Sequence, residues 1–285
     1  MADYGEAPSA LVVEDVLIDE HCVGDRWEVK DIDQLAKLVA IIVMGQATHA
    51  AHILRELTPA TPAFTNENLQ SEAITKLTVQ EEKQSPRIGY PRWQRDGLIF
   101  EAISWIAARS HYGTDVYLKD PHVSSTSQGL DGLMIEMESG GHEISQTTIF
   151  EDKCSENPRE TFNQKVIPAF LDRHGNKRSA ELIASAASLI KLSGIDDMAA
   201  MRAAERVLDI NFRRYRASMA VTAEFDTDEQ RQVLFRGYDV LSGIEATQRV
   251  GASFVVDGEL RDWFDAFAGQ AVVFLKTLNG VPADV

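Results

Sequence analysis

Residues 129–158 read GLDGLMIEMESGGHEISQTTIFEDKCSENP, and this stretch decides the expected fold. Two apolar runs flank a glycine pair, which is the pattern of a β-hairpin. Asp131 lies on the first predicted strand, and Glu151, Asp152 and Lys153 end the second. Because strand side chains alternate between the two faces, Glu151 and Lys153 point the same way and Asp152 points the opposite way. Two acids and a lysine can therefore meet at one end of a sheet.

The register of this hairpin decides whether the acids share a site. A tight turn on the glycine pair alone sets Asp131 opposite Phe150, so that its carboxylate faces away from Glu151. A three-residue loop over residues 140–142, or a bulge of equal effect, sets Asp131 opposite Glu151. A common site therefore requires the odd-length loop or a bulge.

A predicted helix with an acid on its apolar face precedes the hairpin. It covers residues 92–110, and four of its side chains share one face at three-to-four spacing: Leu98, Glu101, Trp105 and Ala108. A buried ionised carboxylate is costly without a partner, so Glu101 should find a cation, a metal or a hydrogen-bond donor. Either it reaches the site at the hairpin, or it is a capping or salt-bridged glutamate at the rim of the core.

The order helix with an acid, strand, strand with Asp131, strand with Glu151-x-Lys153, then helix resembles the PD-(D/E)XK nuclease superfamily. Glu101 resembles the additional helix acid found in several branches of that superfamily. The resemblance implies an α/β fold with a restriction-endonuclease-like αβββαβ core and helical N- and C-terminal additions. The expected parts are a mainly helical segment, a nuclease core, and a helix/strand segment that completes the core or binds a partner: residues 1–86, 87–175 and 176–285.

Phosphodiester hydrolysis needs a nucleophilic water, stabilisation of charge on the phosphate oxygens and help for the departing alkoxide, and a divalent metal serves all three. Two carboxylates plus phosphate oxygens suit Mg²⁺ or Mn²⁺. The expected metal ligands are Asp131, Glu151 and Asp152, the last through its backbone carbonyl. Lys153 can direct its ammonium at the attacking water or the phosphate. Glu101 is expected to hold a metal-bound water or a second ion.

Polar residues near the hairpin are candidates for substrate contacts. Gln164 and Lys165, on a helix predicted after Pro158, either reach back toward the metal or a phosphate or lie on the surface. Arg159 can contact the backbone of a nucleic acid. A basic-aromatic cluster before the hairpin suggests contacts to a strand and is equally compatible with solvation of a helix end: Arg87, Arg92, Trp93 and Arg95.

The composition is that of a folded chain with an unusual charge. Of 285 residues, 44% are hydrophobic and 25% are charged, which are ordinary values, but the formal net charge is -16. Proteins that hold phosphates over a long footprint are usually basic, so this charge disfavours tight binding of free nucleic acid by the isolated chain. A local basic groove, a metal or a partner subunit can supply the missing positive charge.

A nuclease of this acidity is expected to be the effector of an assembly that supplies its substrate, for example with a helicase or sensor subunit. The organisation is similar to the nuclease effector subunits of Hachiman-type bacterial antiviral defence systems. The expected substrate is DNA, or else RNA. Two alternatives remain open: a non-catalytic scaffold or binding subunit with the same fold, and a helical interaction protein whose hairpin is merely solvated.

The sequence also predicts a cellular location. The only cysteines, Cys22 and Cys154, have no neighbours at metal-ligand or disulfide spacing, which favours a reducing compartment. The N-terminus lacks the basic start and apolar run of a signal peptide. The most apolar segment, residues 35–54, is interrupted by a lysine and two histidines and is predicted to be a buried helix. We therefore expect a cytoplasmic protein without a membrane partner.

Overall fold

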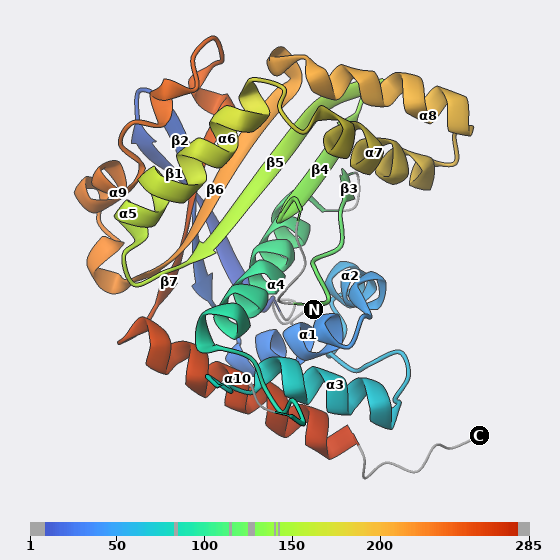
Figure 1. Cartoon of the computed structure of the whole chain (residues 1–285), viewed down its shortest axis with the longest axis vertical. Helices are drawn as coiled ribbons and strands as arrows, with labels where there is room; N and C mark the ends of the chain where they lie inside the picture. Colours follow the sequence, from blue (N-terminus) through green and yellow to red (C-terminus); the bar gives the residue numbers. More distant parts are fainter. Residues whose placement is uncertain are drawn as a thin grey trace, which may run out of the picture.

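The computed structural model describes residues 9–82, 85–113, 116–124, 129–139, 141 and 143–278. Its centre is a seven-stranded mixed sheet in the order β1-β2-β7-β6-β5-β4-β3 (Figure 1). The strands are β1 (Leu11–Asp19), β2 (Cys22–Val29), β3 (Val116–Leu118), β4 (Gly132–Met137), β5 (Ile144–Cys154), β6 (Arg213–Thr222) and β7 (Arg249–Val256). Pairing is parallel from β2 through β7 and β6 to β5, and antiparallel at both sides of the sheet. The fold is therefore mixed α/β, as the sequence predicts.

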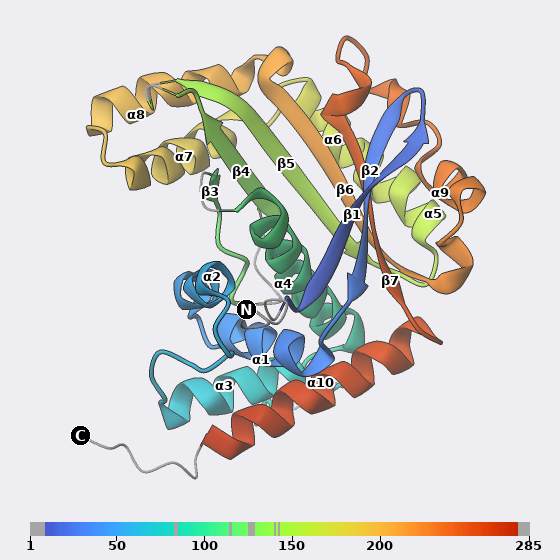
Figure 2. The same cartoon turned by 180° about the vertical axis from the view of Figure 1, so that it is seen from behind.

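Helices cover both faces of the sheet (Figures 1 and 2). One face carries α4 (Arg92–Tyr112). Four further helices lie beside α4: α1 (Ile32–Val43), α2 (Ala47–Glu56), α3 (Glu67–Leu77) and α10 (Leu260–Thr277). The opposite face carries α5 (Pro158–Thr161), a π-helical turn (Phe162–Val166), α6 (Ile167–His174), α7 (Ser179–Ile190), α8 (Asp197–Ala204) and α9 (Asp228–Phe235).

The alternation of strand side chains divides the core into two apolar layers. Phe150, Ala220 and Phe254 pack toward α4 and α10. Their strand neighbours Ile149 and Met219 pack toward the helices of the opposite face. In β5, the residues that follow Ile149 in the same alternation are the acid and the lysine of the predicted site, so the buried strand sets the direction of both.

The sheet draws strands from all three predicted segments: β1 and β2 from residues 1–86, β3 to β5 from 87–175, and β6 and β7 from 176–285. The sequence predicts a strand or an extended arm only near residues 10–18, and β2 is an addition. The buried helix predicted over residues 35–54 is two helices, α1 and α2. They separate at Gly45, whose positive φ of 84° favours glycine.

The sequence also predicts a polar helix over residues 67–84, and the observed helix ends earlier, at Leu77. It stops there because Val79 forms a parallel bridge to Tyr90, which requires extended backbone. The apolar stripe of residues 259–278 predicts a final amphipathic helix, and α10 (Leu260–Thr277) agrees with it. Within the described part of the chain, no helix combines the length and apolar character needed to cross a bilayer.

Candidate active site

A β-bulge sets the register of the β4–β5 hairpin. Gly132 pairs with Phe150, so Asp131, the next residue along, lies opposite Glu151. Toward the turn the register shifts by one residue between the Glu136 and Met137 pairs. This bulge does what an odd-length loop would do. Gly140 and His142 of the predicted loop lie outside the described residues. The register is therefore given by the residue pairs between β4 and β5.

Gly132 leaves room for the aromatic ring of Phe150, its partner on the neighbouring strand. A Cβ added at Gly132 would lie 2.4 Å from Phe150 Cδ2, a distance that no side chain tolerates. The Phe150 ring in turn lies beneath the Arg216 guanidinium, with Cζ 3.6 Å from the ring centroid. The glycine after Asp131 therefore serves close packing between the two strands.

Three oxygen atoms converge on the ammonium group of Lys153. The Nζ atom lies 2.7 Å from Asp131 Oδ2 and 2.7 Å from Glu151 Oε1, and it donates to the backbone carbonyl oxygen of Asp152 at 3.1 Å. The backbone N–H of Asp152 donates to Asp131 Oδ2 at 2.9 Å, which fixes that carboxylate. The structure thus brings together Asp131, Glu151 and Lys153, with the Asp152 carbonyl beside them.

Burial and charge couple these groups. Burial raises the pKa of Glu151, and the nearby Asp131 carboxylate raises it further, while the Lys153 ammonium opposes both. Burial alone would lower the pKa of Lys153, but the two carboxylates outweigh burial and raise it. Lys153 is therefore held as a cation, which can supply positive charge but cannot readily accept a proton.

The side chain of Asp152 points away from the site, as the alternation predicts. Its carboxylate is almost completely buried, with Arg216 Nη2 3.9 Å from Oδ1. Burial raises its pKa from 3.8 to about 7, although Arg216 pulls in the other direction. Only the backbone carbonyl of Asp152 can contribute to the expected metal site.

The raised pKa of Asp152 predicts a pH-dependent stability. Between about pH 4 and pH 7 the folded protein retains a proton that the unfolded chain has released, so stability falls as pH rises through this window. Asp152→Asn removes the effect. In urea unfolding with EDTA present, we expect the variant to match the parent near pH 4 and to exceed its unfolding free energy by up to about 4 kcal/mol at pH 8.

Asp226→Asn is the control for that measurement. Hydrogen bonds from Arg26 hold the pKa of Asp226 below its usual range, and Arg231 acts in the same direction. The stability that Asp226 contributes is present at neutral pH and is lost as pH falls, so its variant should weaken the protein at pH 8 and not in strong acid. A difference between Asp152→Asn and the parent that does not change with pH would contradict the assignment.

An open cleft of about 460 Å³, called here the α4–β5 cleft, gives access to Asp131 and Lys153. Glu151 does not line it and is joined to it through its ion pair with Lys153. Glu101 lines the same cleft but is held by His122. Its Oε1 accepts the backbone N–H of His122 at 2.7 Å, and the His122 Nδ1 lies 3.2 Å from Oε2. The carboxylate of Glu101 therefore has a hydrogen-bond donor as its partner, and its expected contact with a metal-bound water or a second ion stays a prediction.

The helix that follows β5 separates the two residues predicted on it. A π-helical turn, Phe162–Val166, widens the helix by one residue, and Lys165 within this turn lines the α4–β5 cleft. Gln164 does not reach the cleft, because its amide donates to Glu160 Oε1 at 2.9 Å. Arg159 is also outside it. Its guanidinium donates to two backbone carbonyls at the C-terminal end of α9, those of residues 234 and 236.

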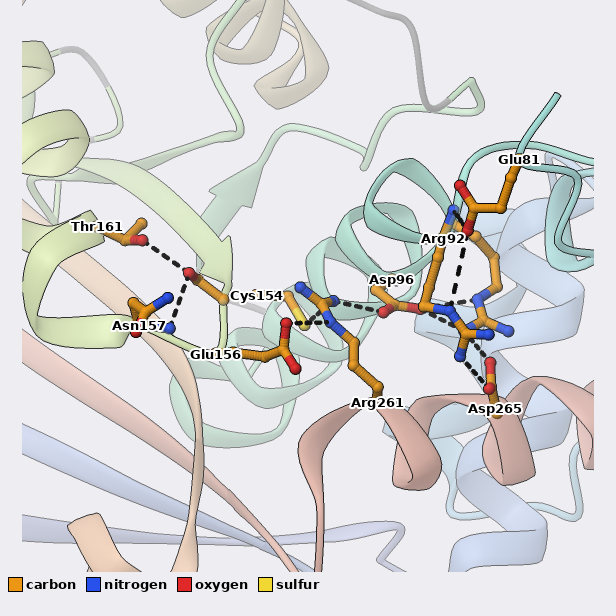
Figure 3. A network of polar contacts seen from close by, with 11 residues as sticks. Glu81, Arg92, Asp96, Cys154, Glu156, Asn157, Thr161, Arg261 and Asp265 are labelled. Atoms are coloured by element: carbon orange, nitrogen blue, oxygen red, sulfur yellow. Dashed lines mark hydrogen bonds and ion pairs between the residues drawn. The ribbon is translucent and has the colours of Figure 1, made fainter. Parts of the chain in front are cut away.

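An ion-pair network joins α4 and α10 to the end of β5 (Figure 3). Asp96, fully buried in α4, accepts hydrogen bonds from Arg95 at 2.8 Å and from Arg261 of α10 at 2.5 Å. Arg261 also lies 3.5 Å from Glu156 Oε2, just past β5. On the next turn of α10, Asp265 pairs with Arg92 and Arg95. Two arginines of the predicted basic cluster are thus used in packing, which leaves Trp93 between them exposed.

Sequence reasoning missed two residues of the cleft. Arg261 lines it from α10, more than a hundred residues after the hairpin, and no local pattern marks it. His122 lines it beside Glu101, and the sequence gives this histidine no spacing to another histidine that is typical of a metal site. Its position ahead of the hairpin is a weak signal, because a loop that leads into Asp131 must pass the same end of the sheet.

The donors at the cleft fit a hard divalent cation with few protein ligands. Within the described ranges, no group of three His, Cys, Asp or Glu side chains is placed to hold a metal. Two carboxylates and one carbonyl nevertheless surround a single cation, the Lys153 ammonium. Mg²⁺ is commonly bound by one or two carboxylates, with water and phosphate completing the shell. Comparison with family models, curated proteins and solved structures finds no match to this chain.

Proposed function

We propose that the chain is a metal-dependent nuclease that hydrolyses phosphodiester bonds in DNA, or in RNA. The observation that carries the proposal is the convergence of Asp131, Glu151 and the Asp152 carbonyl on one ammonium group beside an open cleft. The order of elements adds support. The helix α4, the strands β3, β4 and β5 and, after the helices α5 to α8, the strand β6 keep the order of an αβββαβ, restriction-endonuclease-like core with additional helices before its last strand.

Each residue of the site has a separate role in the proposed hydrolysis. Asp131 and Glu151, with the Asp152 carbonyl, would hold Mg²⁺ or Mn²⁺, which supplies an activated water and neutralises charge on the phosphate. Lys153 is held as a cation by its two acidic neighbours and presents positive charge where charge develops on the phosphate oxygens. Glu101 fixes the backbone and ring of His122 at the wall of the cleft.

The charge of the chain supports a role within an assembly. A net charge of -16 repels a polyanion, so affinity for long nucleic acid must come from elsewhere. We therefore place the chain as the effector subunit of a bacterial defence assembly, in the cytoplasm, with a helicase or sensor partner that delivers the substrate.

One observation favours a second candidate function, a non-catalytic scaffold. The Lys153 ammonium already neutralises both carboxylates, which is what a structural ion-pair cluster at a sheet end would do. The two functions differ in what Mg²⁺ does to the protein. A scaffold has no reason to bind the metal or to cut, whereas a nuclease does both.

The deciding experiment is metal-dependent cutting. The full chain, alone and with any partner that co-purifies with it, is incubated with plasmid, single-stranded and RNA substrates in Mg²⁺, Mn²⁺ or EDTA. We expect cutting with either metal and none in EDTA, and a loss of at least about 100-fold in Asp131→Asn, because one metal ligand is removed.

Glu138→Gln is the matched control for Asp131→Asn. It alters an acid at the turn end of the same hairpin, where Glu138 pairs with Arg206. This variant should cut like the parent. Absence of cutting under all conditions, or full cutting by Asp131→Asn, would rule out the proposed function and leave the scaffold.

A further inference from the structure

Gly97 is a glycine that the packing of its helix does not require. It lies inside α4, where glycine is less favourable than alanine. A Cβ at Gly97 would meet nothing within 4 Å. The residue lines the α4–β5 cleft. What its missing side chain provides is free space on the wall of that cleft.

Trp93 shares the helix face of Gly97 and lines the same cleft. Its side chain is 64% exposed, whereas Trp27 and Trp105 are 1% and 3% exposed. Its neighbour Arg92 turns toward Asp265 on α10 (Figure 3). Arg95 pairs with the same carboxylate. The face therefore presents, one turn apart, an exposed indole, an open glycine position and then Glu101.

The cations of the cleft are mostly committed to acids of the protein itself. Lys153 is held by Asp131 and Glu151, and Arg261 pairs with Asp96 and Glu156. In the part of the chain that the structure describes, Lys165 is the cation of this cleft that has no partner of its own. Affinity for a nucleic acid at this place must therefore come largely from contacts other than ion pairs with phosphate.

Stacking on an aromatic ring is the contact that the cleft can offer. A base stacked on an indole contributes substantially to binding, and every base has a face that can do so. In a duplex the bases are already stacked and paired, so Trp93 would have no base face to contact. A single strand exposes its bases and bends sharply enough to follow a short helix face.

We propose that the α4–β5 cleft binds a single-stranded nucleic acid segment, with one base stacked on Trp93, the sugar-phosphate backbone passing over Gly97, and a phosphate at Lys153. The position of the phosphate rests on the proposed nuclease function, whereas binding through Trp93 and Gly97 does not require cutting. The substrate class is thereby a single strand or an unwound end, which is the form of nucleic acid that an unwinding partner produces.

Binding of dye-labelled oligonucleotides tests the proposal. The probes are a twelve-nucleotide thymidine strand and a twelve-base-pair duplex, measured by fluorescence anisotropy with the full chain, once in EDTA and once in Ca²⁺. We expect the single strand to bind at least about tenfold more tightly than the duplex. Trp93→Ala should weaken single-strand binding about 5- to 100-fold, and Trp93→Phe should restore part of the loss.

Variants at two glycines show whether binding needs the free space at Gly97, or whether any leucine introduced into a helix weakens binding. Gly97→Leu fills the wall and should weaken single-strand binding at least about tenfold, while Gly97→Ala adds only a Cβ in free space and should bind nearly as the parent does. Gly269, exposed inside α10 and also without neighbours within 4 Å of an added Cβ, is the control. Gly269→Leu should leave binding unchanged. Melting curves confirm that each variant is folded.

Several results would overturn the proposal: duplex binding as tight as single-strand binding, Trp93→Ala within twofold of the parent, or no binding of the single strand. Cutting assays then separate it from the nuclease function. Single-strand binding that depends on Trp93, without cutting in Mg²⁺, supports this proposal and removes the nuclease. Cutting that prefers duplex and ignores Trp93 and Gly97 supports the nuclease and removes this proposal.

Discussion

Replacing Lys153 with methionine is expected to lower cutting by about 100- to 1,000-fold, the cost of losing one positioned charge at a reacting centre. Methionine keeps an unbranched side chain of similar length and removes the ammonium on which Asp131, Glu151 and the Asp152 carbonyl converge. The two carboxylates then face each other without a cation, so Glu151 takes up a proton more readily and becomes a poorer metal ligand.

The measurement compares initial cutting rates per folded molecule in saturating Mg²⁺ at several pH values. Lys153→Arg keeps the charge in a different shape and should retain more activity than the methionine variant. Lys177→Met removes an exposed lysine that pairs with Asp172 and should have no effect. Activity of Lys153→Met within tenfold of the parent would show that the ammonium is structural and would favour the scaffold.

Asp96→Ala is expected to lower the unfolding free energy by about 3–5 kcal/mol, the usual cost of removing one partner from a buried ion pair. Asp96 is completely buried between Arg95 and Arg261, and without it two guanidinium groups lose their shared acceptor. The same network fixes the first turns of α4 against α10 and the end of β5, so the variant should also disturb the wall that carries Trp93.

Urea unfolding measures this cost. Asp228→Ala is a suitable control, because Asp228 pairs with Arg231 while its side chain is 74% exposed, and an exposed pair is worth less than about 1 kcal/mol. Equal destabilisation by the two variants would mean that the Asp96 network contributes no more than a surface pair. In that case the position of α4 depends on its apolar contacts.

Local pattern was sufficient to predict the acids and the lysine of the site. Strict alternation in β5 gives Glu151 and Lys153 one direction and Asp152 the other, whatever the rest of the chain does. Local pattern was insufficient for the register, because the glycine pair favours a tight turn that would separate Asp131 from Glu151. The bulge near Met137 restores the match, and nothing in its sequence distinguishes it from regular strand.

Contacts between distant segments could not be read from the sequence. The pairing of Arg261 with Asp96 depends on where α10 packs, and the burial of Arg216 depends on Phe150 and Trp27 from two other strands. Gln164 and Lys165 are neighbours, and the sequence gives no reason to expect one of them rather than the other in the cleft. In the folded chain Lys165 lines the cleft, while Gln164 donates to Glu160 on the preceding turn, and this difference depends on where the helix packs.

The place of the β1–β2 hairpin in the sheet has a consequence for synthesis. Val23 of β2 pairs in parallel with Val250 of β7, so the strand on which the hairpin docks is made long after it. Roughly 230 residues separate the two, which is about 10–45 s of elongation on a ribosome. During this time the hairpin exposes Trp27 and an unpaired strand edge, a known risk for aggregation. Completion of the sheet is therefore a late step, and the nascent chain depends on β7 to bury its first strands.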